Sequence, residues 1–404
     1  MDVSVVLVSR FRLLPDPAQE AALLTHCAHA RFVWNLAVEQ YAHWRQGRTA
    51  APGYNDQCRQ LTEARAAFDW LAAGSVTVQQ QALRDFAQAM RNFFSATHRR
   101  PTWRKAGVHE GFRQVGVMPE HIRKLNRKLS AVSVPKIGWV RSRRSRAVPG
   151  GVRSYRVTRD RTGRWHVAFA AVPEPIPAPG TGETVGVDRG VAVSAALSTG
   201  ELLRCPDLSV KEAERLVRLQ RRLVRAKRGS NRRKRLKRAA ARLRARAADR
   251  RKDWAEKTST DLARRFDRVY VEKLNIRAMS KSARGTVTAP GRNVRQKASL
   301  NRRILASGWG LLAVRLRHKA PGRVDGVNAA YSSQECSVCG HIAAESRESQ
   351  ARFRCVACGH EVHADINAAI NINNRGRTTL AARGALQPPG GAVNREPQPE
   401  SPAA

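Results

Sequence analysis

The sequence predicts an α+β protein built from several domains, and three observations along its 404 residues support this. The apolar periodicity is helical up to about residue 104 and changes to strand-like alternation after it. A proline-rich stretch from Pro173 to Pro179 excludes regular structure and marks the main domain boundary. Two Cys-x-x-Cys-Gly sequences, beginning at Cys336 and Cys355, predict a small metal-binding module near the end.

The first region predicts one strand followed by helices. Residues 1–14 alternate imperfectly, with apolar Val3, Val5 and Leu7 on one face. Asp16 and Gln19 form a capping pair around Pro17, so a helix is expected to begin there and to end at Gly47. Two more helices are expected over residues 56–73 and 75–97, which makes residues 16–104 a helical domain.

Strands follow over residues 105–172. A turn from Asp160 to Gly163 separates two alternating runs and predicts a hairpin. We expect this region to form a small barrel or sheet that pairs with the N-terminal strand, so that residues 1–15 and 105–172 share one domain. Residues 173–182 are the expected linker.

The second half predicts a mixed α/β domain. Residues 184–200 are expected to form a strand, a tight turn and a second strand. A helical hairpin is expected over residues 207–266 and turns near residues 229–231, with leucines of its two helices facing each other. Another strand ends at Glu272, a basic loop covers residues 277–297, a helix covers residues 299–319, and a further strand ends at Tyr331. Residues 374–404 are expected to form a disordered tail.

The charge of the chain predicts a polyanionic partner. The formal net charge is +42, and self-repulsion of this size opposes a compact free protein. This charge makes nucleic acid the leading partner. A membrane partner is not expected, because no apolar stretch approaches the roughly 18 residues of a membrane span. One face of the helical hairpin carries almost only cations, whereas solvated faces usually mix signs. We therefore expect it to bind nucleic-acid phosphates through Arg232, Arg233, Lys234, Arg235, Lys237, Arg238, Arg242 and Arg246.

The four paired cysteines predict a structural zinc ribbon. Cys336, Cys339, Cys355 and Cys358 supply two thiolates from each knuckle, with fifteen residues (340–354) between the pairs. A structural zinc fills all four positions, so the ribbon is not the catalyst. The remaining cysteines, Cys27, Cys58 and Cys205, are interpreted as small apolar residues in a reducing cytosol.

Three carboxylates lie where chemistry is expected. Asp188 ends a strand, Glu272 ends another, and Asp365 begins a helix. Taken singly, Asp365 could be a helix cap and Glu272 an ordinary acid at the end of a strand, but an unpaired carboxylate within an apolar strand is costly. Together they suit a pair of Mg²⁺ ions that act on a phosphodiester. The order of strands and helices around them is that of a ribonuclease-H-like fold.

Several sequence motifs resemble the TnpB (OrfB) proteins of bacterial insertion sequences, which are compact relatives of the type V CRISPR nucleases. These are Gly186-Val-Asp188-Arg-Gly190, Val271-Glu272-Lys-Leu274, the stretch from Tyr331 through the ribbon, and Asp365-Ile-Asn-Ala-Ala-Ile-Asn-Ile372. The resemblance extends from about residue 3 to 373.

The resemblance implies a wedge β-barrel (1–15 and 105–172) interrupted by a helical recognition domain, and then a RuvC-like nuclease domain (183–335 and 360–373) with the ribbon (336–359) inserted. It implies that Asp188, Glu272 and Asp365 are catalytic and bind Mg²⁺. It also implies a guide RNA from the transposon end, a double-stranded DNA target that pairs with it, and a bacterial cytoplasmic protein associated with the nucleoid when it acts.

One departure from the family pattern leaves alternatives open. Members commonly have Asp-Arg-Asp before the Asn-Ala-Ala, whereas this chain has His363-Ala364-Asp365. His363 could hydrogen-bond a scissile phosphate, but the preferred interpretation is that it caps the turn from ribbon to helix. Besides an RNA-guided endonuclease, the sequence permits a guided DNA-binding regulator with little cleavage, or a transposase that joins strands without a guide. No helix-turn-helix reader is apparent, which disfavours the transposase.

Overall fold

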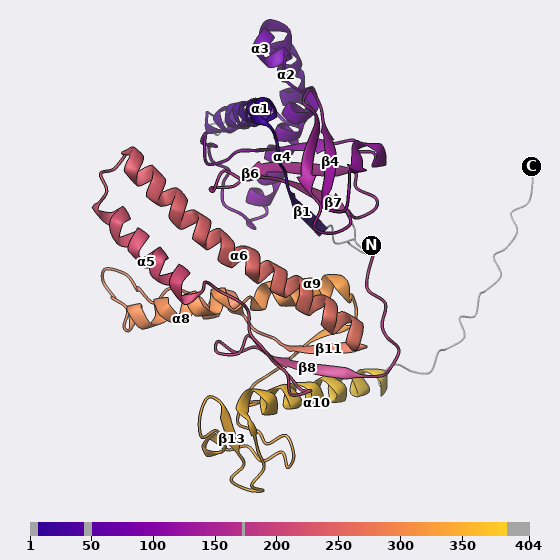
Figure 1. Ribbon diagram of the computed structural model, residues 1–404, viewed down its shortest axis with the longest axis vertical. Helices are drawn as coiled ribbons and strands as arrows, with labels where there is room; N and C mark the ends of the chain where they lie inside the picture. Colours follow the sequence, from indigo (N-terminus) through magenta and orange to yellow (C-terminus); the bar gives the residue numbers. More distant parts are fainter. Residues whose placement is uncertain (1–6, 44–50, 172–173, 386–404) are drawn as a thin grey trace, which may run out of the picture. The chain divides into compact units, whose positions relative to one another are not determined.

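The computed structural model describes residues 7–43, 51–171 and 174–385 (Figure 1). The chain divides into two compact units, Met1–Glu174 with Ser209–Ala245, and Pro175–Leu208 with Arg246–Ala404. The helical hairpin belongs to both units, because its second helix, α6 (Asn231–Arg265), passes from the first unit into the second. None of the described helices is long and apolar enough to cross a membrane.

The first unit contains the expected helices, with one break. The predicted capping box is confirmed, since the Gln19 amide donates to Asp16 Oδ1 at 2.8 Å and the Asp16 amide donates to Gln19 Oε1 at 3.2 Å. The single helix expected over residues 56–73 is wrong. Phe68 has an extended backbone there, and Arg65 donates to the carbonyls of Leu71 and Ala72 beyond the break. The helices are α1 (Pro17–Ala42), α2 (Tyr54–Ala67), α3 (Asp69–Ala72) and α4 (Val76–Phe94). The predicted stop at Gly47 lies outside the described residues.

Two antiparallel sheets complete this unit. The first has the order β1 (Leu7–Arg12), β7 (Trp165–Ala171), β6 (Ser154–Arg159), β2 (Gly111–Val115). The second consists of β3 (Ile122–Lys124), β4 (Leu129–Val134) and β5 (Gly138–Arg143). The predicted hairpin and its pairing with the N-terminal strand are confirmed, because β6 pairs with β7 and β7 with β1. Val3 and Val5 lie outside the described residues, and closure into a wedge barrel stays a prediction.

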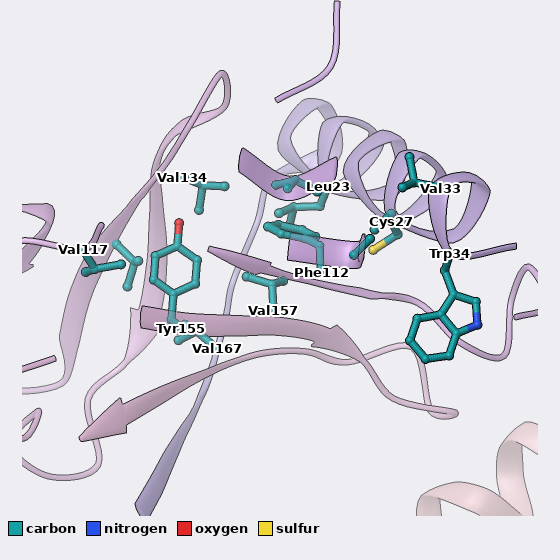
Figure 2. Close-up of a cluster of buried hydrophobic side chains, with 14 of the residues drawn as sticks. Leu23, Cys27, Val33, Trp34, Phe112, Val117, Val134, Tyr155, Val157 and Val167 are labelled. Atoms are coloured by element: carbon teal, nitrogen blue, oxygen red, sulfur yellow. The ribbon is translucent and has the colours of Figure 1, made fainter. Parts of the chain in front are cut away.

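Helix α1 packs its apolar face on the first sheet (Figure 2). Leu23 and Cys27 are fully buried and belong to one core with Phe112, Tyr155 and Val157. Burial raises the pKa of the Cys27 thiol to about 12, so this cysteine is a packing residue, as the sequence predicted.

The second unit is a sheet covered by helices on both faces (Figure 1). Its order is β10 (Leu202–Leu203), β9 (Ala195–Leu197), β8 (Thr184–Asp188), β11 (Arg268–Glu272), β12 (Val324–Val327). Strands β8, β11 and β12 are parallel, and β9 is antiparallel to β8. Leu262 of α6 and Leu312 and Leu316 of α9 (Trp309–Lys319) cover one face. Helix α10 (Ala364–Ala385) covers the other.

The elements of this half differ from prediction in three places. The helix expected over residues 299–319 is two helices, α8 (Val294–Ala306) and α9, because Gly308 adopts a left-handed conformation with φ 77°. The strand expected to end at Tyr331 ends at Val327. The disordered tail predicted from residue 374 is wrong up to residue 385, since α10 continues to Ala385, and residues 386–404 lie outside the described part.

The remaining elements lie where the sequence placed them. The basic loop contains only the short helix α7 (Ile276–Met279) before α8. The hairpin consists of α5 (Val210–Arg225) and α6, and the ribbon contains β13 (Arg352–Arg354) and β14 (Glu361–His363).

Gly186 sets how closely α10 approaches the sheet. A Cβ at this position in β8 would clash with the backbone oxygen of Ala369 and the backbone nitrogen of Asn373, neither of which can rotate away. Helix and strand are therefore in backbone contact directly behind Asp188.

We predict that Gly186→Ala destabilises the protein by about 1–3 kcal/mol, because the added methyl group forces α10 off the sheet. Urea unfolding would measure the change. Gly326→Ala in β12 is the matched control, since its Cβ would meet only the Lys273 side chain, at 3.8 Å. Equal stability of the two variants would contradict the close packing at Gly186.

Candidate functional site

The three predicted carboxylates gather at one edge of the second sheet. Asp188 is the last residue of β8 and Glu272 the last of β11. These neighbouring parallel strands pair Val187 with Val271, which puts the two acids side by side. Asp365 is the second residue of α10, which packs against β8, and its carboxylate lies 3.6 Å from the Cβ position of Gly190.

Burial and mutual repulsion dominate the electrostatics of this cluster. Asp365 is 7 % exposed, and Asp188 and Glu272 are half-buried. Burial, together with the nearby carboxylates of Glu272 and Asp365, raises the pKa of Asp188 to about 8. Burial also raises the pKa of Glu272. Burial and the neighbouring negative charges make the ionised form of these carboxylates unfavourable. A cation that binds between them would stabilise the ionised form.

Two arginines neutralise part of this charge. The Arg189 amide donates to Glu272 Oε2 at 3.1 Å, and its guanidinium donates to the Glu272 backbone carbonyl. Arg347, from the ribbon, pairs with Asp365 at 3.3 Å between Nη2 and Oδ1. Arg347 also lowers the pKa of Asp188, against the larger raising effects. The role of Arg347 was not predicted, because one arginine in a polar ribbon loop carries no local signal.

The departure at residues 363 and 364 has a structural explanation. Ala364 is fully buried and packs with Cys336, Phe353 and Cys355 in the core of the ribbon. A guanidinium still reaches Asp365, from Arg347 elsewhere in the ribbon. His363 Nδ1 accepts the Asp365 amide at 3.2 Å, so the capping role predicted for His363 is confirmed.

The four predicted cysteines form one cluster. Their sulfurs all lie within 4.8 Å of one another, with Cys336 and Cys358 at 3.7 Å and Cys339 and Cys355 at 3.6 Å. Four thiols at this spacing fit a tetrahedral structural zinc ion. Within the described residues, this is the one group of three or more metal-ligating side chains packed so tightly, and the three carboxylates are more loosely spaced.

Two asparagines join the ribbon to α10. Asn367 accepts the Ser337 amide at 2.9 Å and donates to the Glu335 carbonyl at 2.7 Å, and it is fully buried. Asn371 donates to the carbonyls of Ser332 and Glu335, at 2.9 and 2.7 Å. Both asparagines belong to the Asn-Ala-Ala-Ile-Asn run, so this motif anchors the ribbon to the helix that carries Asp365.

The basic hairpin presents most of its predicted cations to solvent. Leu219, Leu236 and Leu243 are buried, and the side chains of the opposite face are exposed. Arg233 differs, since its guanidinium donates to the carbonyls of Leu223 and Ala226, at 2.7 and 2.9 Å, and so fixes the turn between the helices. The exposed cations are Arg232, Lys234, Arg235, Lys237, Arg238, Arg242 and Arg246.

We predict that Cys336→Ser releases bound zinc and loosens the ribbon, because a hydroxyl is a poor zinc ligand and Cys336 is 1 % exposed. Elemental analysis and limited proteolysis of the C-terminal region would measure both effects, with Cys205→Ser as the control. A protein that is free of zinc yet equally resistant to protease would contradict the metal's structural role.

Comparison with known proteins identifies three family models along the chain. The OrfB_IS605 model, described as "Probable transposase", matches residues 166–283. The Cas12f1-like TNB domain model matches residues 309–372, and a helix-turn-helix domain model matches residues 5–49. The last match corrects the expectation that no such domain is present, although the described part of that range folds as β1 and the single helix α1.

Curated relatives align over nearly the whole chain. The "Putative RNA-guided DNA endonuclease InsQ" of Escherichia coli (strain K12) is 36% identical over 96% of this chain and 96% of its own length. A "Putative RNA-guided DNA endonuclease" of Streptomyces pristinaespiralis is 29% identical over 94% of this chain and 91% of its own.

A solved structure shares the fold. It is that of a Cas12f1–sgRNA–target DNA complex, with a TM-score of 0.55 at 14% identity over 89% of this chain and 83% of that one. The extent and identity of the InsQ match place this chain in the TnpB (OrfB) family of insertion-sequence proteins.

Proposed function

We propose that this protein is a transposon-encoded, RNA-guided DNA endonuclease that hydrolyses phosphodiester bonds at Asp188, Glu272 and Asp365. The observation that carries the proposal is the convergence of these acids at one sheet edge, where burial and mutual repulsion raise the pKa of Asp188. Two full-length relatives bear the name of RNA-guided DNA endonuclease, which supports the same activity here. In this proposal the second unit together with residues 209–245 of the hairpin forms the RuvC-like domain, and the rest of the first unit combines the wedge and recognition domains.

The donor set fits hard divalent cations. Carboxylate oxygens are the ligands that Mg²⁺ prefers, and the three acids lie in a basic protein that otherwise attracts anions. A pair of bound Mg²⁺ ions would supply an activated water and stabilise the leaving oxygen of the phosphodiester.

The chain's own residues prepare this site. Arg189 fixes Glu272 through its amide, and α10 presents Asp365 from its first turn. Arg347 holds Asp365 and is 29 % exposed, so its guanidinium is also accessible to a phosphate oxygen. Exposed cations of the α5–α6 hairpin would hold the guide RNA or target DNA through phosphates in any sequence.

Asp188→Asn is predicted to abolish guided cleavage and to leave RNA and DNA binding unchanged, because the amide keeps the shape but cannot hold a cation equally well. The protein would be co-expressed with its downstream flanking transcript, and the purified complex given Mg²⁺ and a plasmid that matches the guide. Asp325→Asn, at an acid of β12 that pairs with Arg268, is the control.

The result separates three functions. Cleavage by the parent that is lost in Asp188→Asn supports the guided nuclease. Bound RNA and target binding without cleavage by the parent would indicate a guided regulator instead. Strand joining with no specific RNA would indicate a transposase, the activity named in the description of the matched family model.

Arg347→Ala is predicted to reduce the cleavage rate by roughly 10- to 100-fold, the range found for residues that support metal ligands. Zinc content and nucleic-acid affinity should stay at the parent's values. Arg354→Ala is the matched control, since Arg354 is an exposed ribbon arginine that pairs with Glu361. Equal cleavage rates in the Arg347→Ala and Arg354→Ala variants would mean that Arg347 does not contribute to the carboxylate site.

A further inference from the structure

A short segment after α4 carries a basic and aromatic surface that the carboxylate site does not use. Residues 99–105 read Arg-Arg-Pro-Thr-Trp-Arg-Lys, with four cations and no acid. Trp103 is 53 % exposed, whereas Trp165 and Trp309 are each 3 % exposed. Burying an indole ring is favourable, so the exposed ring of Trp103 offers a large apolar surface to a ligand.

Helix α1 holds the backbone of this segment rigidly. Trp34 Nε1 donates to the Thr102 carbonyl at 3.0 Å. The Asn35 side chain makes two hydrogen bonds with the Arg104 backbone. Its Nδ2 donates to the Arg104 carbonyl at 3.0 Å, and its Oδ1 accepts the Arg104 N–H at 2.7 Å. Arg100 donates to the Tyr41 carbonyl at 2.9 Å. The indole of Trp103 is therefore presented by a fixed backbone, which lowers the entropy cost of binding.

Arg104, the residue after Trp103, points in the opposite direction and already stacks on an aromatic ring of the protein. Arg104 turns toward α1, with its guanidinium carbon 3.6 Å from the centroid of the Trp34 ring. Arg104 and Trp103 thus point to opposite sides of an extended segment, one inward and one outward. No aromatic ring of the described residues stacks on Trp103, whereas the exposed Trp70 contacts the rings of Phe32 and His29.

The charges around Trp103 favour nucleic acid over a protein surface. Arg99 and Lys105 are exposed, and no carboxylate of the described chain pairs with them. Protein interfaces surround their aromatic anchors with apolar contacts and few lysines. An aromatic ring flanked by cations is instead the arrangement that binds single strands, in which a base stacks on the ring and the cations hold the phosphates.

We propose that Trp103 is a stacking platform for an unpaired nucleobase, with Arg99 and Lys105 binding the adjacent phosphates. This deepens the proposed function, because guided recognition requires unpaired nucleotides in the guide RNA and in the opened DNA. The ligand is an unstacked nucleotide in either strand. A closed duplex keeps its bases stacked and cannot offer one.

Fluorescence anisotropy with the full-length protein tests whether a base stacks on Trp103. The probes are oligouridylate, oligothymidylate and a blunt DNA duplex. Stacking is worth about 1–3 kcal/mol per base, so Trp103→Leu should weaken single-strand binding by about 5- to 150-fold. The salt dependence and the duplex affinity should not change, since no charge is lost. Trp103→Phe should recover most of the affinity, and Trp70→Leu serves as the control for loss of an exposed indole.

Either of two binding results would overturn the proposal. One is single-strand affinity of Trp103→Leu equal to that of the parent. The other is an equal loss for single strands and duplex, which would indicate general damage. In the assembled complex, photocrosslinking with 4-thiouridine in the RNA or 4-thiothymidine in the DNA identifies the strand, and no crosslink to the peptide of Trp103 from either strand would also contradict it. These tests need no cleavage, so failure of the nuclease assay and failure of stacking are distinguishable.

Discussion

Repulsion among three close carboxylates, of which Asp365 is buried and Asp188 and Glu272 are half-buried, is the central constraint on this structure. Asp188, Glu272 and Asp365 come from distant parts of the sequence and meet at one sheet edge, where burial raises the pKa of Asp188 to about 8. Such an arrangement costs folding free energy unless a cation compensates it. The packing of the second unit supplies the rigidity to hold it, with parallel β8 and β11 fixing two acids and α10 in backbone contact with Gly186 fixing the third.

The ribbon contributes to this site without providing the chemistry. Asn367 and Asn371 anchor it to α10, and Ala364 joins its core directly before Asp365. Arg347 then returns from the ribbon to the carboxylate of Asp365. A zinc ion bound by the four cysteines would therefore help to hold the ribbon from which Arg347 reaches the candidate catalytic site.

Local sequence patterns made much of the fold and of the metal-binding ribbon predictable. The capping pair Asp16 and Gln19, the turn at Asp160 and the cysteine spacing each depend on residues close in sequence, and the structure has all three. The roles of Arg347 and Arg233 were not predictable, because each depends on contacts with residues that only the fold brings near. The breaks at Phe68 and Gly308 were missed for a related reason. Apolar periodicity continues through both positions. The extended backbone at Phe68 lies beside contacts of Arg65 with carbonyls beyond the break, and the break at Gly308 comes from its left-handed backbone.

Titration of Mn²⁺ into the zinc-loaded parent and Asp188→Asn proteins, followed by electron paramagnetic resonance, tests the central claim most directly. We expect two bound Mn²⁺ ions in the parent and loss of this binding in the variant. We also expect tighter binding in the parent as pH rises from 6 to about 8, because Asp188 must release a proton whose pKa burial has raised. Equal Mn²⁺ binding by the two proteins would contradict the account, and so would the absence of binding to the parent at any pH in this range.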